Sequence, residues 1–144
     1  MKRGKVVRSG KALGAALTAI GKEFEGDLDK VIQKLTLDGF RELLRRTPVR
    51  TGFLKSRWAT EINAPYPQIL VKNPGGSFSP APVPNAIMFQ WGDKITIYNN
   101  TEYAWHVEHG TQQHRAQPMA EPTYMYLENM ANRLLDHLSK QKKS

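Results

Sequence analysis

The chain has 144 residues, of which 40% are hydrophobic, and it carries a formal net charge of +8. This length predicts a single domain, residues 1–144, with one modest core. The chain contains no cysteine, which excludes a disulfide framework, a thiolate nucleophile and a cysteine zinc site. No apolar run approaches the roughly 18 residues that a membrane helix needs, and the basic N-terminus lacks a signal-peptide apolar region. We therefore expect a soluble protein with no membrane partner.

The basic residues are concentrated in clusters. Residues 1–10 form a basic arm that we expect to be flexible, and a second cluster follows near residue 46. Such clusters attract polyanions, nucleic acid above all, although solvated helix faces are an alternative explanation for each. The residues that could contact DNA or an acidic partner are Lys2, Arg3, Lys5, Arg8, Arg45, Arg46 and Arg50.

Two long apolar stripes predict helices. The first runs from about residue 9 to residue 46 with apolar residues at three- and four-residue steps, and because glycines interrupt it, we expect the helix in two pieces. Pro48 ends this helix, since the residue before a proline is disfavoured in the helical conformation. Thr51 is suited to cap a short helical turn that extends through Trp58. The second stripe predicts a C-terminal helix over residues 121–140.

The middle of the chain alternates as strands do. Residues 60–63 and 68–72 predict two short strands, joined by a bend that contains Pro65 and Pro67. Residues 73–87 are rich in proline and glycine, which predicts a long exposed loop.

A hairpin is predicted over residues 88–98, with its turn at Gly92 and Asp93. With the flanking helices, this gives an α+β fold in which the long N-terminal helix and the C-terminal helix pack on a small, largely antiparallel β-sheet.

The candidate catalytic and metal-binding residues are histidines and glutamates. Imidazoles bind metals, but the spacing of His106, His109 and His114 matches no strong metal motif. Glu108 could act as a general base with Glu102 as its partner, but the favoured interpretation is that Glu108 caps backbone donors or pairs with an arginine. The sequence also lacks a phosphate-binding loop. We therefore expect no enzyme activity, no metal and no cofactor.

Aromatic residues interleave with basic ones, an arrangement that could stack on single-stranded nucleic acid. More often such residues fill a small core or an interface, and we favour that interpretation. They are Trp58, Trp91, Trp105, Tyr98 and Tyr103.

Two short segments and two later prolines carry a more specific pattern. Residues 48–54 read Pro-Val-Arg-Thr-Gly-Phe-Leu, and residues 103–111 read Tyr-Ala-Trp-His-Val-Glu-His-Gly-Thr. In this order, over roughly residues 30–140, the chain resembles the gene-product-ten-like family of tailed-bacteriophage neck proteins, which also occur in prophages. It departs from the family pattern at His109, Met119 and Thr123. The residues that carry the resemblance are Pro48, Thr51, Gly52, Leu54, Tyr103, Ala104, Val107, Glu108, Gly110, Thr111, Pro118 and Pro122.

The second segment also has a physical interpretation. Gly110 permits the left-handed residue that ends a helix, and Thr111 can hydrogen-bond within its own turn. Glu108 can accept from the amides that this turn frees, or from an arginine near Gly52. These contacts would fix the loop that leads to the last helix.

The resemblance implies a structural virion protein that completes the tail or joins it to the head. Such a protein would form a homo-oligomeric ring, expected as a hexamer, around the passage of genomic DNA. It would contact other neck and tail proteins and assemble in the cytoplasm of the bacterial host. A tail-tube terminator is the nearest variant. The charge leaves a protein of another class open, a small basic nucleic-acid-binding protein.

Overall fold

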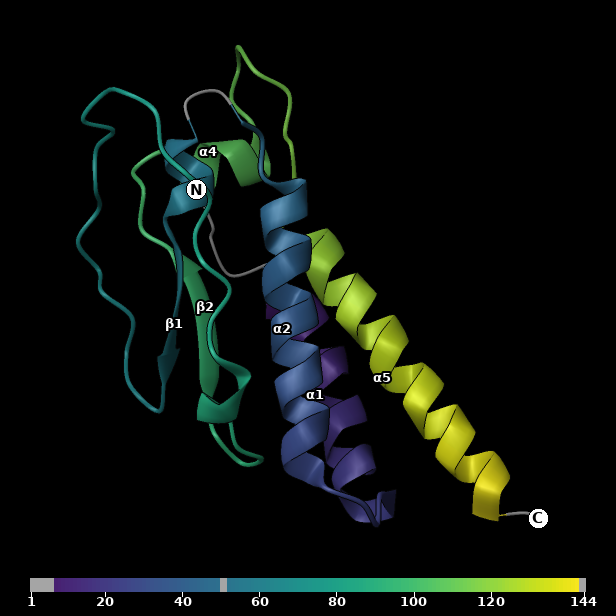
Figure 1. The fold of residues 1–144 in the computed structure, drawn as a ribbon. Helices are drawn as coiled ribbons and strands as arrows, with labels where there is room; N and C mark the ends of the chain where they lie inside the picture. The colour runs from purple at the N-terminus through teal and green to yellow at the C-terminus, as the bar shows by residue number, and fades with distance from the viewer. Residues whose placement is uncertain (1–6, 50–51, 143–144) are drawn as a thin grey trace.

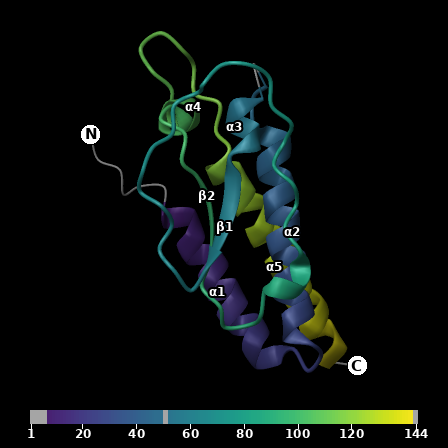
Figure 2. The same ribbon diagram turned by 60° about the vertical axis from the view of Figure 1, so that its left-hand side comes forward.

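The computed structural model describes residues 7–49 and 52–142 (Figure 1). Three long helices lie on one side of a two-stranded sheet in both ribbon views (Figures 1 and 2). This α+β arrangement confirms the predicted fold class. Among the described residues, no helix is both long and apolar enough to span a bilayer. The elements are α1 (Val7–Glu23), α2 (Leu28–Arg46), α3 (Phe53–Ser56), β1 (Trp58–Ile62), η2 (Ala86–Met88), β2 (Ile95–Asn99), α4 (Ala104–His109) and α5 (Ala120–Lys142).

The predicted N-terminal helix forms in two pieces, as expected. α1 ends at Glu23, and α2 begins at Leu28 after a short turn at the bottom of Figure 1. Asp27 caps α2, because its side chain accepts a hydrogen bond from the amide of Asp29 at 3.0 Å. α2 ends at Arg46, close to the predicted boundary before Pro48.

α5 packs against both α1 and α2, and it extends slightly beyond the predicted residues 121–140. At its contact with α1, Ala16, Ile20 and Ala131 are buried. Small side chains on both helices allow them to approach closely, and Ile20 fills the space between them with 0% exposure.

The sheet pairs β1 with β2 in antiparallel register, from Trp58 opposite Asn99 to Ile62 opposite Ile95. The strand predicted at residues 60–63 is therefore confirmed, with small shifts in its ends. Trp58 begins this strand, so the prediction that the preceding helical turn extends through Trp58 was wrong. The Trp58 side chain is buried, and its indole nitrogen donates to Oγ1 of Thr47 at 2.8 Å.

The hairpin predicted over residues 88–98 was wrong. Residues 86–88 form the 3₁₀-helix η2, and β2 pairs with β1 instead of with the residues just before it. Asn63 favours the pairing of β2 with β1, because it joins the end of β1 to the start of β2. Its amide donates to the carbonyl of Lys94 at 2.9 Å, and its side chain accepts from the amide of Lys94 at 2.8 Å.

The strand predicted at residues 68–72 does not form in the described monomer. This stretch is extended, but only Val71 makes a bridge, which is parallel and joins it to Thr101. Pro65 and Pro67 lack the amide hydrogens that a longer ladder would need. The segment passes on the side of the sheet away from the helices (Figure 1), where Tyr66 stacks on Tyr98.

Residues 73–87 are mostly exposed, but Phe78, Pro84 and Ala86 are partly buried and Ala81 is buried. Ala81 is only 6% exposed, and its amide donates to the carbonyl of Lys55 at 3.1 Å. The loop thereby contributes one residue to the principal core. The buried members of that core are Phe40, Leu43, Leu54, Trp58, Ala81 and Met119.

Candidate functional site

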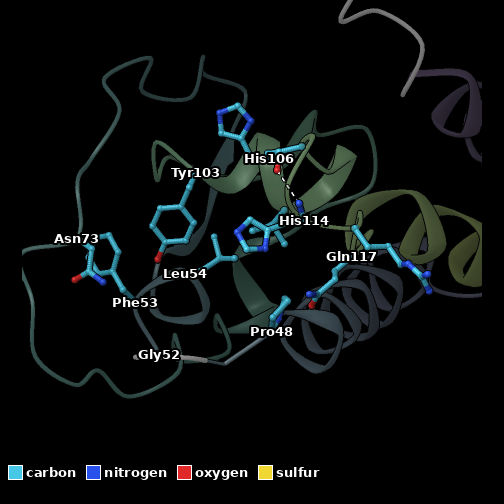
Figure 3. Close-up of a pocket in the computed structure, with 12 residues that line it drawn as sticks. Pro48, Gly52, Phe53, Leu54, Asn73, Tyr103, His106, His114 and Gln117 are labelled. Carbon is cyan, nitrogen blue, oxygen red and sulfur yellow. Dashed lines mark hydrogen bonds between the residues drawn. The ribbon is translucent and has the colours of Figure 1, made fainter.

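The two segments that carry the resemblance lie side by side in the fold. They border a cavity of about 740 Å³ between α3, α4 and the residues that precede α5 (Figure 3). Much of its wall is apolar, with polar side chains from the loop after α4. The lining residues are Pro48, Gly52, Phe53, Leu54, Asn73, Tyr103, His106, Val107, Thr111, His114, Arg115 and Gln117.

Gly52 fixes the start of α3. Its φ of 84° lies in the left-handed region, and a Cβ added there would overlap the carbonyl oxygen of Phe78. The ring of Phe53 packs on that of Phe78 with 5.0 Å between ring centroids. Thr51, the predicted cap, lies outside the described residues, and Gly52 occupies the N-cap position.

Tyr103 connects α4 with α3 across the cavity. Figure 3 shows its hydroxyl pointing toward Leu54 and Phe53. Burial raises the pKa of Tyr103, and a hydrogen bond with the Leu54 backbone partly opposes this. Asn99 makes a second link, since its side-chain amide donates to the carbonyl of Leu54 at 2.8 Å. The end of β2 is therefore tied to α3 as well.

The turn after α4 confirms the predicted role of Thr111, whereas Gly110 has the expected positive φ but, with a ψ of 171°, not the left-handed helical conformation. Gly110 ends α4 with a φ of 80°, and a Cβ there would lie 2.8 Å from the backbone nitrogen of Ala116. Oγ1 of Thr111 accepts from the amide of His114 at 3.0 Å and from the amide of Gln113 at 3.2 Å. These contacts hold the loop close to α4.

Glu108 accepts backbone hydrogen bonds, as predicted, but from a different set of amides. Its Oε1 lies 2.8 Å from the amides of Met119 and Ala120, and its Oε2 lies 3.2 Å from that of Glu121. These amides belong to the beginning of α5 and not to the turn at Gly110. The carboxylate therefore caps the last helix from α4, and its charge lies near the positive end of the α5 dipole.

The two prolines of the pattern lie on either side of this cap. Pro118 precedes the capped amides, and the preceding residue, Gln117, donates its amide to the carbonyl of Val107 at 2.8 Å. Pro122 lies in the first turn of α5, where a missing amide hydrogen breaks no bond within the helix. The hydroxyl of Thr123 donates to the carbonyl of Met119 at 2.6 Å.

The histidines predicted as possible ligands do not gather at one point. His109 packs on Trp105 with 3.8 Å between ring centroids, whereas His106 and His114 are exposed at the cavity. In the part of the chain that the structure describes, no group of three histidine, cysteine, aspartate or glutamate side chains is placed to hold a metal. Glu102 is exposed, and Glu108 is engaged by backbone amides.

The described part of the basic cluster is internally paired. Arg45 and Arg46 reach Glu42 on the same helix, with N···O distances of 2.6 and 2.8 Å. The hydrogen bond from Arg45 lowers the pKa of Glu42, burial opposes this, and the hydrogen bond from Arg46 adds to the lowering. Lys2, Arg3, Lys5 and Arg50 lie outside the described residues, as does the side chain of Arg8.

Sequence reasoning missed three participants in this site. Asn99 binds the Leu54 carbonyl, Phe78 packs on Phe53, and Gln117 binds Val107. An asparagine at the end of a predicted strand was the one available signal for Asn99, since asparagine often hydrogen-bonds backbone groups at such positions. No family model, curated protein or solved structure gives a significant match to this chain.

Proposed function

We propose that this protein is a structural component of the neck of a tailed bacteriophage, where it completes the tail or joins it to the head. It acts by assembly, as a ring of identical subunits around the passage of the DNA. The observation that supports this most is the shared cavity: Pro48, Gly52 and Leu54 from one segment of the pattern line it with Tyr103, Val107 and Thr111 from the other.

The contacts between the two segments support the resemblance, because segments that matched the family pattern by chance would not be expected to contact one another. Glu108 caps α5, Gly110 supplies the positive φ that ends α4, and Tyr103 reaches the backbone of Leu54. Each of these three residues has a role that another residue type fills poorly. A pattern whose members build one structural unit is what a family constraint would produce.

Assembly is also supported by what the surface presents. Ile69 is 79% exposed and Ile87 is 76% exposed, and both lie in the long connection between β1 and β2. Apolar side chains of this kind are buried when subunits associate. The net charge of +8 suits a ring that encloses DNA or rests on an acidic neighbouring ring.

The test is deletion of the gene from the genome that carries it, followed by electron microscopy of the lysate. Filled heads beside unattached tails of normal length are expected, and a plasmid copy of the wild-type gene should restore infectious particles. Tails of uncontrolled length would assign the terminator role instead. Normal infectious virions without the gene would overturn the neck assignment.

The net charge of +8 also favours a second candidate, a small nucleic-acid-binding protein. That protein would bind duplex DNA as an isolated monomer, with an affinity that falls steeply as salt rises. Arg45 and Arg46 are already paired with Glu42, so other basic residues would have to supply most phosphate contacts. Absence of DNA binding at moderate salt would remove this candidate.

A further inference from the structure

The segment between Pro67 and Asn73 has the sequence of a strand but lacks a strand's partner. Residues 64–70 make no hydrogen bond with any other described residue. Leu70 is 64% exposed, although leucine in an extended segment is normally covered by a neighbour. The segment is thus largely apolar, and only Val71 joins it to the rest of the subunit.

Val71 determines which edge of this segment is available. Its amide donates to the carbonyl of Asn100 at 2.7 Å, and its carbonyl accepts from the amide of Glu102 at 3.1 Å. In an extended chain, the backbone groups of alternate residues point to opposite sides. Leu70 and Lys72 therefore direct their N–H and C=O groups away from this bridge, toward the outside of the subunit.

β1 offers a complementary edge. It pairs with β2 along one side, and no other described residue forms a backbone hydrogen bond with Trp58–Ile62 on the other side. The nearest such bond, from Ala81 to the carbonyl of Lys55, comes before the strand begins. A strand added at this edge would satisfy backbone groups that have no partner among the described residues.

We propose that residues 68–72 of one copy add to the free edge of β1 in a neighbouring copy, and so form the contact that closes the ring. This inference rests on the proposed function and names its interface. The lengths agree, because β1 has five residues and residues 68–72 offer the same number. Paired end to end in antiparallel register, the two segments place Ile69 opposite Glu61 and Leu70 opposite Thr60.

A donor segment on one surface and an acceptor edge on another make a heterologous contact, which forms a ring when the rotation between copies closes. Pro65 and Pro67 cannot donate to a ladder, so they stop the added strand from lengthening. Strand addition of this kind derives its affinity from main-chain hydrogen bonds.

Disulfide cross-linking tests the pairing directly, because the chain contains no cysteine of its own. Two double variants are compared under mild oxidation, Glu61→Cys with Leu70→Cys, and Glu61→Cys with Ile69→Cys. Side chains alternate between the faces of a strand, so the variant with Ile69→Cys should give a ladder of covalently linked subunits and the variant with Leu70→Cys should not. Equal ladders in both, linkage within one chain only, or no linkage would overturn the proposal.

A proline variant gives an independent measurement of the same contact. Leu70→Pro removes an amide hydrogen that makes no bond in the described monomer, so the monomer should remain folded. Its oligomer, measured by light scattering after size exclusion, should be lost, whereas Leu70→Thr, which keeps the amide and favours strands, should retain it. Loss in both variants, or in neither, would overturn the strand pairing.

These outcomes separate the two proposals. If the Leu70→Pro variant forms the same ring as the wild type, and the cross-linking shows no alternation, the strand addition is rejected but the neck assignment remains intact. A wild-type chain that remains monomeric at every concentration also rejects strand addition between copies. The neck assignment is rejected only by normal virions after gene deletion.

Discussion

Glu108 and Met119 are joined by a hydrogen bond in which the backbone amide of Met119 donates to Oε1 of Glu108 at 2.8 Å. Glu108 belongs to α4, whereas Met119 immediately precedes α5. The first amides of a helix have no partner within it, so this carboxylate satisfies donors that would otherwise depend on water. One side chain thereby fixes the position of α4 relative to the last helix.

Glu108→Gln should lower the free energy of unfolding by about 1–2 kcal/mol, because it removes the charge at the helix N-terminus and one of the two acceptor oxygens. Urea denaturation near pH 7 measures the change. The control is Glu102→Gln at an exposed position close by, which should change stability by less than about 0.5 kcal/mol. Equal losses in the two variants would show that the cap contributes nothing.

Gly110→Val should destabilise the fold by more than about 1 kcal/mol. The backbone has a φ of 80° at this position, and an added Cβ would lie 2.8 Å from the backbone nitrogen of Ala116. Thermal unfolding followed by circular dichroism measures the loss. An unchanged melting temperature would show that the turn is not held as described.

Gly75→Val separates backbone strain from the clash with Ala116. Gly75 has a φ of 91°, but nothing lies within 4 Å of a Cβ placed there. This control should therefore carry only the conformational cost of a β-branched residue at positive φ. The difference between the two variants measures the close approach of the 110–116 loop.

The helices and the positive φ at Gly110 could be predicted from the sequence because their signals are local. A stripe of apolar residues indicates α1 and α2, Gly26 lies in the break between them, and Pro48 follows the end of α2. Gly110 and Thr111 determine their turn through their own conformational preferences. The target of Glu108 could not be predicted in this way, because the start of α5 reaches it only through the fold of residues 110–118.

The sheet could be predicted only in part, since a strand pattern does not reveal a strand's partner. Residues 68–72 contain the apolar and β-branched residues typical of a strand, yet in the monomer they are joined to the sheet through Val71 alone. β2 could have paired with the residues just before it, but Asn63 fixes its start against the end of β1. Both errors concern pairing, which depends on contacts distant in sequence.

Glu42 should make stability fall in acid. The pKa of Glu42 in the folded protein lies below the usual value of about 4.3. Its contribution to the free energy of unfolding is therefore present above that value and is lost as the pH falls through the folded pKa. Glu42→Gln should flatten the stability profile below about pH 4. Asp136→Asn, in the exposed ion pair of Asp136 with Lys140, is the control and should leave the profile unchanged. A wild-type slope in Glu42→Gln would contradict the assignment.

Tyr103 should make stability fall in alkali, for the opposite reason. Burial raises its pKa in the folded protein above the usual value of about 10. As the pH rises past 10, the unfolded chain loses the Tyr103 proton before the folded chain does. The contribution of this group to the free energy of unfolding is therefore present below that pH and is lost as the pH rises through the folded pKa. Tyr103→Phe should therefore reduce the alkaline slope of unfolding free energy, whereas Tyr66→Phe, at a side chain 45% exposed, should not. Matching slopes in the two variants would mean that the Tyr103 hydroxyl is not buried against α3.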